Sequence, residues 1–192
     1  MIKAIIFDFF GVFRTDSYNG WLIRNNRSRV GDFFDASYQV DMGKMTRDEF
    51  LLKIGQLVGR TVTAEELDEG VSIDQAVVKL ADGLSYDYRL GLISNAPSKL
   101  IRQLLADNNL NRLFDKIVIS SEVGMVKPHP DIFEHTLLEL GIAADEALFI
   151  DDNIENVEQA HKLGITSLQF ISADQLGRDL AAIGITGVQP VN

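Results

Sequence analysis

The stretch Ala4-Ile5-Ile6-Phe7-Asp8-Phe9-Phe10-Gly11-Val12 places a carboxylate at the end of an apolar run. The run is too short for a helix and has the composition of a buried strand. A strand buried on both faces of a parallel sheet is expected to carry a charge only at the carboxyl edge, where such sheets bind their ligands. We therefore predict that Asp8 is a functional residue at this edge.

Other apolar runs along the chain also end in polar groups. They are followed by Ser94, by Lys127 and by the pair Asp151 and Asp152. If all these runs are strands of one parallel sheet, their polar groups meet Asp8 at a single edge. A carboxylate, a hydroxyl, an ammonium group and two further carboxylates together suit a phosphoryl group and a divalent cation.

From about residue 84 onward the chain alternates between strand-like and helix-like segments. This alternation predicts an α/β fold with a parallel sheet covered by helices on both faces. Hydrophobic patterning, Pro and Gly positions and a Ser172/Gln175 cap predict the boundaries. The predicted strands are residues 89–93, 116–119, 147–150 and 167–171, and the predicted helices are residues 98–108, 130–140, 154–163 and a last one after Ser172.

Residues 16–82 have a different pattern, with helical periodicity and no convincing buried strand. Thr46 with Glu49 and Thr63 with Glu66 match the capping box that begins a helix. We predict a small all-helical domain at 16–82, inserted after the first strand of a core formed by 1–15 and 83–192. Its expected core contains Phe33, Phe34, Phe50, Leu51 and Ile54.

The amino-acid composition argues against several classes of partner and of chemistry. The 192 residues include 18 Lys and Arg against 28 Asp and Glu, and a net charge of −10 disfavours binding to nucleic acid or to an anionic membrane. The absence of cysteine excludes disulfides and thiolate chemistry. No signal peptide and no apolar run of membrane-spanning length is recognisable, so we expect a cytoplasmic protein.

The order of these motifs resembles that of the haloacid dehalogenase-like hydrolase superfamily, in its branch with a helical cap after the first motif. The likeness covers nearly the whole chain. The segments 149–157 and 93–95 look most similar to bacterial sugar-phosphate phosphatases, and the amino-terminal phosphatase domains of soluble epoxide hydrolases are relatives in that branch. The resemblance implies a three-layer, Rossmann-like core with a parallel sheet.

The resemblance also implies roles for individual residues. Asp8 matches the nucleophile, which would form an aspartyl phosphate, and Lys127 matches the lysine that neutralises charge between nucleophile and phosphate. Ser94 matches the phosphate-binding hydroxyl, and Asn95 beside it would contact the phosphoryl group or the nucleophile loop. The implied Mg²⁺ ligands are Asp8, the backbone carbonyl of Phe10, Asp151 and Asp152.

Several of these residues also have a structural alternative, and for Asp8 it is that a strand-terminal aspartate caps the turn that follows. Asp152 with Glu155 could cap a helix, as could Ser94 and Asn95, and a lysine beside a proline is usually in a solvated loop. Two adjacent acids at a strand end are unfavourable without a cation, which favours the metal interpretation for Asp151 and Asp152.

Phe10 departs from the pattern of the family, whose phosphatases usually carry a second Asp two residues after the nucleophile as general acid and base. Loss of such a group costs roughly 10²–10⁴ in rate. The substrate could then have a leaving group that needs little protonation, another group could supply the proton, or the protein could be slow or inactive. An aromatic residue here also resembles metal-independent 2-haloacid dehalogenases, although the acidic pair at Asp151 and Asp152 argues against them.

We therefore predict a Mg²⁺-dependent phosphatase of small phosphorylated metabolites, with sugar phosphates among the candidates. The alternatives are a 2-haloacid dehalogenase and a weakly active or non-catalytic protein that binds a phosphorylated ligand. Trp21, Arg24, Arg27 and Arg29 could meet an anionic substrate, although an exposed basic helix face is the favoured interpretation. The sequence leaves the substrate and the oligomeric state open.

Overall fold

The computed structural model describes residues 1–15, 21 and 30–185. The strands are β1 (Ala4–Phe7), β2 (Arg89–Ser94), β3 (Lys116–Ile119), β4 (Ala147–Asp151) and β5 (Thr166–Gln169). The helices are α2 (Val30–Asp41), α3 (Arg47–Val58), α4 (Ala64–Leu67), α5 (Gln75–Leu84), α6 (Ser98–Asp107), α7 (Ser120–Val123), α8 (Pro130–Leu140), α9 (Ile154–Lys162) and α10 (Ala173–Ala182). Two short 3₁₀ turns span Asn111–Leu113 and Ala144–Glu146.

The strands form one parallel sheet in the order β3-β2-β1-β4-β5. The strand β1 is central, and its last residue, Phe7, pairs with Leu92 of β2 and Ile150 of β4. The residues that follow Phe7 and Ile150 are Asp8 and Asp151, so the register itself brings these two carboxylates together at the carboxyl edge.

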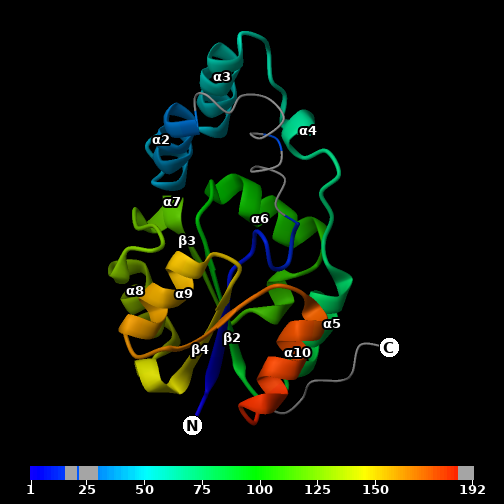
Figure 1. Cartoon of the computed structure of the whole chain (residues 1–192), viewed down its shortest axis with the longest axis vertical. Coiled ribbons are helices and arrows are strands. Elements are labelled where there is room, and N and C mark those ends of the chain that lie inside the picture. The colour runs from blue at the N-terminus through cyan, green and yellow to red at the C-terminus, as the bar shows by residue number, and fades with distance from the viewer. Residues whose placement is uncertain (16–20, 22–29, 186–192) are drawn as a thin grey trace.

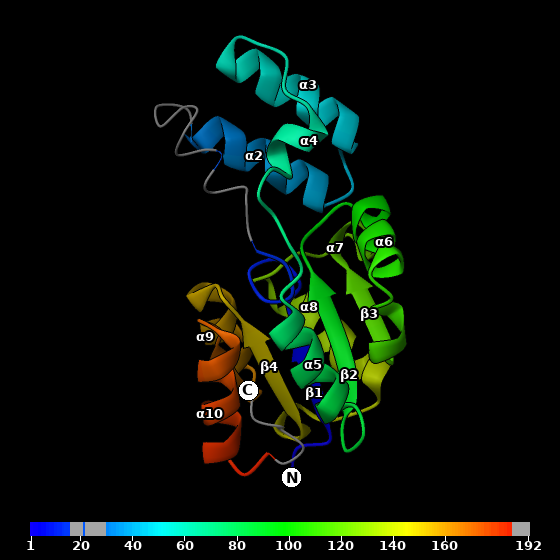
Figure 2. The same ribbon diagram turned by 90° about the vertical axis from the view of Figure 1, so that its right-hand side faces the viewer.

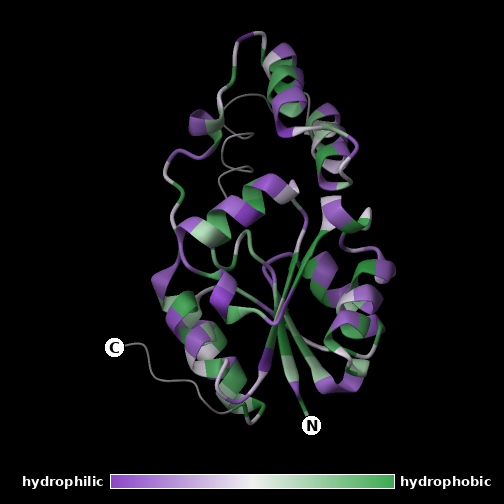
Figure 3. Cartoon of the chain, turned by 180° about the vertical axis from the view of Figure 1, so that it is seen from behind, coloured by the Kyte–Doolittle hydropathy of each residue, from purple (hydrophilic) through white to green (hydrophobic). Residues whose placement is uncertain are grey.

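The sheet lies between two helical layers (Figures 1 and 2). Alternate residues of β1 enter different clusters: Ile5 and Phe7 pack with α5, α6 and α10, whereas Ala4 and Ile6 pack with α8 and α9. This period of two is that of a strand buried on both faces. The helices carry alternating hydrophilic and hydrophobic stripes around the sheet (Figure 3). The predicted three-layer α/β fold is confirmed.

Local sequence signals explain most helix boundaries. Helix α8 has Pro130 at its first turn and ends at Gly141 with φ +62°, as predicted. The Thr46/Glu49 capping box is present at α3. At α4, Thr63 caps the helix, but the Glu66 carboxylate binds Arg60 and the Trp21 indole in place of the Thr63 amide.

Helices α2, α3 and α4, which we call the helical insertion, have a hydrophobic cluster of their own beyond the carboxyl edge of the sheet (Figure 2). Phe33, Phe50 and Ile54 are buried there and Leu51 packs against them, as predicted. The prediction for Phe34 was wrong, because this side chain is on the solvent side of α2 and is 54% exposed.

Helix α5 belongs by packing to the core, since Val77, Leu80 and Leu84 are buried in the same cluster as Ile5 and Phe7. The sequence pattern predicts a boundary between residues 82 and 83, which falls inside α5. We propose that the inserted domain ends before Gln75 and that α5 is part of the core. Among the described residues, no helix combines the length and the apolar character needed to span a membrane.

Candidate active site

Two carboxylates share one ammonium group at the carboxyl edge of the sheet. The Lys127 Nζ atom lies 2.8 Å from Asp8 Oδ1 and 2.7 Å from Asp151 Oδ2. Asp8, Lys127 and Asp151 are 7%, 5% and 0% exposed, so this cluster of charges is almost completely buried. Lys127 is therefore not in a solvated loop, which was its structural alternative.

Burial and the neighbouring charges shift the pKa values of Asp8 and Lys127. Burial raises the pKa of Asp8 well above the ordinary aspartate range, and the charge of Asp151 adds to this rise while Lys127 opposes it. Burial alone would lower the pKa of Lys127, but attraction to Asp151 and Asp8 raises it overall. One ammonium group does not balance two buried carboxylates, and a further cation would stabilise their ionised forms.

Asp151 is held rigidly by its neighbours. Its Oδ1 atom accepts a hydrogen bond from the backbone amide of Asn153 at 2.8 Å, and the Asn156 side-chain amide donates to both carboxylate oxygens at 3.0–3.1 Å. Asn156 is 6% exposed and was not among the predicted site residues. Together with Lys127 these donors fix the carboxylate in one orientation.

Asp152 contacts the loop after β1. A Cβ atom on Gly11, whose φ is +83°, would lie 2.3 Å from the Asp152 carboxylate. Gly11 thus permits both a left-handed backbone and the close approach of this side chain. Helix α9 is capped by Asn153, which accepts from the Glu155 amide at 2.9 Å. Asp152 is therefore not the N-cap that the alternative interpretation required.

The three carboxylates suit a hard divalent cation. Asp8, Asp151 and Asp152 each offer one oxygen, and these oxygens lie within 4.8 Å of one another. An oxygen-only donor set with excess negative charge fits Mg²⁺, which usually takes one or two carboxylates and completes its octahedron with other oxygens. The participation of the Phe10 carbonyl stays a prediction.

Neither Ser94 nor Asn95 caps helix α6, whose N-cap is Pro97. The Ser94 hydroxyl is fully buried and has no hydrogen-bond partner among the described residues. The Asn95 side chain donates to the Lys127 carbonyl at 2.8 Å and accepts from the Lys127 amide at 2.9 Å. Asn95 thus positions the backbone that carries the lysine, and contact of either residue with a phosphoryl group stays a prediction.

Two backbone amides at the start of α6 donate hydrogen bonds to serine hydroxyls of the protein itself. The Ala96 amide donates to the Ser120 hydroxyl at 2.9 Å, and the Ser98 amide donates to the Ser121 hydroxyl at 2.8 Å. An anion at this helix terminus would therefore depend on other donors.

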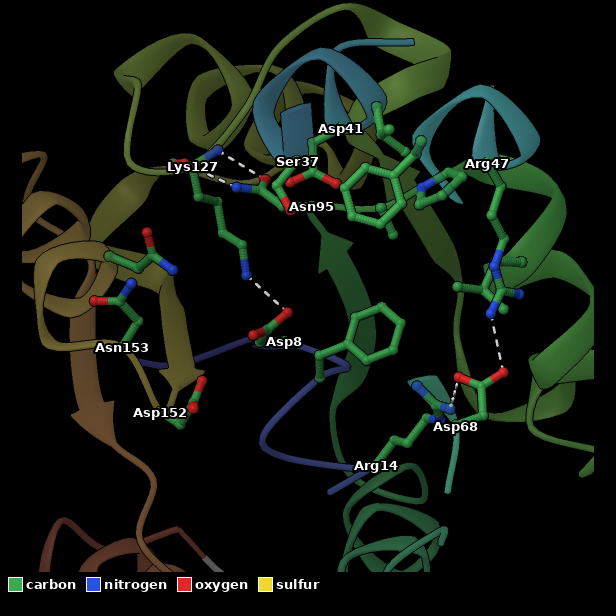
Figure 4. A pocket seen from close by; sticks show the side chains of 17 residues that line it. Asp8, Arg14, Ser37, Asp41, Arg47, Asp68, Asn95, Lys127, Asp152 and Asn153 are labelled. Carbon is green, nitrogen blue, oxygen red and sulfur yellow. Dashed lines mark hydrogen bonds and ion pairs between the residues drawn. The ribbon is translucent and has the colours of Figure 1, made fainter. Parts of the chain in front are cut away.

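A cavity of about 290 Å³ opens over this cluster, between the sheet edge and the helical insertion (Figure 4). Asp8, Lys127, Asp152 and Asn95 line its core side. The insertion contributes Ser37, Val40, Asp41, Arg47 and Phe50, and the remaining lining residues include Phe10, Arg14, Asp68, Asn153 and Asn156. The core and the inserted domain therefore enclose one site together.

An ion-pair network lines another part of this cavity (Figure 4). The Asp68 carboxylate lies 2.7 Å from Arg14 Nη2 and 2.9 Å from Arg47 Nη2. The Arg14 guanidinium also lies 5.2 Å from the centre of the Phe10 ring, within the range of a cation–π interaction. The network joins the loop after β1 to helix α3, and it places two arginines beside the cavity.

Sequence reasoning missed the residues from the insertion and from its junctions, above all Asp41, Arg47 and Asp68. One local signal was available for Asp41: it ends a helix, where the backbone carbonyls disfavour an acid. Of the residues considered in the insertion, Trp21 is buried against Phe33 and does not face the cavity. The predictions for Arg24, Arg27 and Arg29 lie outside the described residues.

Comparison with known proteins shows which family and which folds this chain resembles. The chain is 26% identical to D-ribitol-5-phosphate phosphatase of Bacteroides thetaiotaomicron over 88% of this chain and 92% of the relative. A HAD-like family hydrolase from Porphyromonas gingivalis has the same fold, with a TM-score of 0.77, 23% identity and coverage of 95% and 98% of the two chains. A HAD family enzyme from Bacteroides thetaiotaomicron, solved with magnesium and inorganic phosphate, has a TM-score of 0.70, with 24% identity over 88% and 94%. The family model for haloacid dehalogenase-like hydrolases matches residues 25–170, and the chain therefore belongs to this family of hydrolases.

Proposed function

We propose that this hydrolase is a Mg²⁺-dependent phosphatase of small phosphorylated metabolites. The observation that carries the proposal is the buried cluster of Asp8, Lys127 and Asp151, with Asp152 completing a set of carboxylates at the floor of a cavity. The similarity to a sugar-alcohol phosphate phosphatase over most of both chains supports the same class of substrate.

In the first step an oxygen of Asp8 attacks phosphorus in line, and the bond from phosphorus to the leaving oxygen breaks. Lys127 lies 2.8 Å from Asp8 and offers its ammonium group to the incoming phosphoryl oxygens. The buried Ser94 hydroxyl, which has no partner among the described residues, is available as a further donor. A bound Mg²⁺ would supply charge neutralisation for the transferring group through Asp8 and Asp152.

In the second step a water molecule attacks the aspartyl phosphate, which restores Asp8 and releases inorganic phosphate. Asp151 takes no part in bond making. Its three donors, Lys127, Asn153 and Asn156, hold it so that it orients the lysine and contributes charge toward the cation. Such a fixed arrangement does not have to reorganise during the reaction.

The helical insertion acts as a cap in this proposal. Val40 and Phe50 line the cavity opposite the sheet edge and are buried in the insertion, so they exclude water from the reacting groups. Arg14 and Arg47 provide donors for the hydroxyl or anionic groups of a substrate. A cavity of about 290 Å³ suits a small phosphorylated sugar or sugar alcohol better than a polymer.

The test is phosphate release from the purified protein across sugar phosphates, sugar-alcohol phosphates, acyl phosphates and nucleotides, with Mg²⁺ or with a chelator. We expect hydrolysis with Mg²⁺ only, and none after Asp8→Asn. Because Asp8 is destabilised by burial, Asp8→Asn should fold at least as stably as the wild type, and a thermal unfolding curve separates lost chemistry from lost structure.

Three results would contradict the proposal. Phosphatase activity that persists in Asp8→Asn would exclude Asp8 as the nucleophile. Halide release from 2-haloacids in the presence of the chelator would favour a dehalogenase. Binding of phosphorylated ligands without any turnover would favour a non-catalytic protein.

A further inference from the structure

The site lacks the usual proton donor of family phosphatases, because Phe10 stands two residues after the nucleophile. The charged groups that line the cavity are therefore the candidates for this role among the described residues. They are Asp8, Arg14, Asp41, Arg47, Asp68, Lys127 and Asp152.

Most of these charged groups already interact with other charged residues of the site. Asp8 and Lys127 pair with each other, and Asp152 belongs to the acidic cluster. Asp68 is paired with two arginines. Asp41 differs, because its carboxylate makes no hydrogen bond or ion pair with any residue that the structure describes.

Asp41 is the last residue of α2 and reaches into the cavity from the helical insertion, facing the edge that carries Asp8 and Lys127 (Figure 4). Its position is fixed by the packing of α2, since Phe33, Ala36 and Val40 are buried in the insertion's hydrophobic cluster. The acid thus comes from the inserted domain, and the nucleophile comes from the core.

The surroundings of Asp41 stabilise the protonated form of its carboxyl group up to near-neutral pH. Burial raises its pKa from 3.8 to about 7, although the charge of Lys127 opposes the rise. The position at the C-terminus of a helix acts in the same direction, because the free carbonyls repel an anion. An acid and base is most effective when its pKa lies close to the working pH.

We propose that Asp41 is the general acid and base of this enzyme, a role that rests on the phosphatase function proposed above. As Asp8 attacks phosphorus, the Asp41 carboxyl group donates its proton to the departing alkoxide, which leaves as an alcohol. The resulting Asp41 carboxylate then accepts a proton from the water that attacks the aspartyl phosphate. Release of inorganic phosphate returns Asp8 to the carboxylate and leaves Asp41 protonated.

The test compares two substrates with different leaving groups. An alkoxide has to be protonated as it leaves phosphorus, whereas p-nitrophenolate is stable without a proton. The wild type, Asp41→Asn and Asp35→Asn are assayed with Mg²⁺ on D-ribitol 5-phosphate and on p-nitrophenyl phosphate. Asp35 is the matched control, since it is an exposed acid on the same helix that does not line the cavity.

For Asp41→Asn we expect kcat/KM on the alkyl phosphate to fall by roughly 10²–10⁴-fold. On p-nitrophenyl phosphate, kcat/KM should change far less, because this constant reports the steps up to release of the phenolate. Hydrolysis of the aspartyl phosphate should be slow, so the variant should release one equivalent of p-nitrophenol in a burst. Asp35→Asn should match the wild type on both substrates.

An equal loss on both substrates would overturn the proposal, because it would indicate a structural or binding role for Asp41. Unchanged activity on the alkyl phosphate would overturn it as well. Both results leave the phosphatase function intact. Failure of that function would be seen separately, as a wild type without turnover or as activity that survives Asp8→Asn.

Discussion

Gly11 is the residue whose replacement should most directly disturb the acidic cluster. In Gly11→Ala the new Cβ would lie 2.3 Å from the Asp152 carboxylate, so that side chain must move and Mg²⁺ binding should weaken. The positive φ adds about 1–2 kcal/mol of backbone strain. Gly59→Ala is the matched control, because Gly59 has φ +73° and nothing within 4 Å of its Cβ position. Mg²⁺ titration by calorimetry should show weaker binding for Gly11→Ala alone, and equal affinities would contradict the prediction.

Asn95 should be important to activity because of the backbone it binds. Asn95→Ala removes two hydrogen bonds to the Lys127 main chain, and we expect a loss of about 1–3 kcal/mol in the free energy of unfolding. The phosphatase kcat should also fall, since Lys127 loses its support. Asn108→Ala removes one exposed hydrogen bond to the Leu104 carbonyl and is the control for urea denaturation. A similar stability loss in both variants would argue against a special role for Asn95.

At the scale of elements, Asp68 connects the inserted domain to the core. It pairs with Arg14 after β1, whose side chain is 8% exposed, and with Arg47 at the start of α3. Asp68→Ala leaves the Arg14 guanidinium buried without its anion, so we expect a loss of about 2 kcal/mol, less than a fully buried pair would cost. Asp82→Ala breaks an exposed pair with Arg112 and should cost below about 1 kcal/mol. Denaturation curves with equal shifts for both variants would contradict this.

The core elements were predictable because their signals are local. Strand β3 and helix α8 have the predicted bounds, since an apolar run with turn signals and a Pro-to-Gly helix need no distant contact to be recognised. Elements that depend on long-range packing were less predictable. The pattern of α5 is that of any amphipathic helix, and only its contacts with the sheet place Val77 and Leu80 in the core. Glu66 likewise matched a capping box, but Trp21 and Arg60 bind its carboxylate.

Across the whole molecule, the predicted residues that line the candidate site come from the sheet edge, and sequence reasoning did not point to the lining residues that the insertion supplies. The carboxyl ends of parallel strands lie at one edge of the sheet regardless of the loop conformations. The proximity of Asp8 and Asp151 could therefore be predicted from the strand pattern alone. Which side chain of α2 or α3 reaches that edge depends on how two domains dock. Helical periodicity contains no information on this, and Asp41 and Arg47 therefore required coordinates.

The raised pKa values of Asp41 and Asp8 should make the stability of the whole protein depend on pH in a defined direction. The pKa of Asp41 is about 7 in the folded state, against an ordinary value of 3.8. Between these values the folded protein keeps a proton that the unfolded chain has lost. The contribution of Asp41 to the free energy of unfolding is therefore fully present below pH 3.8, and it is lost as the pH rises toward 7. Asp8, whose pKa is also raised, acts with the same sign, so a comparison of two variants is needed to isolate Asp41.

Asp41→Asn removes this ionisation and leaves Asp8 unchanged. The variant should therefore gain stability relative to the wild type as the pH rises from 4.5 to 8, because only the wild type must ionise a half-buried acid beside the cavity. Urea denaturation at several pH values, in the absence of Mg²⁺, measures the difference in unfolding free energy at each pH. Asp35→Asn, which alters an exposed acid on the same helix that does not line the cavity, is the control measured under the same conditions. A difference for Asp41→Asn that stays flat over this range would mean that Asp41 ionises normally in the folded protein, and its role as an acid near neutral pH would lose its physical basis.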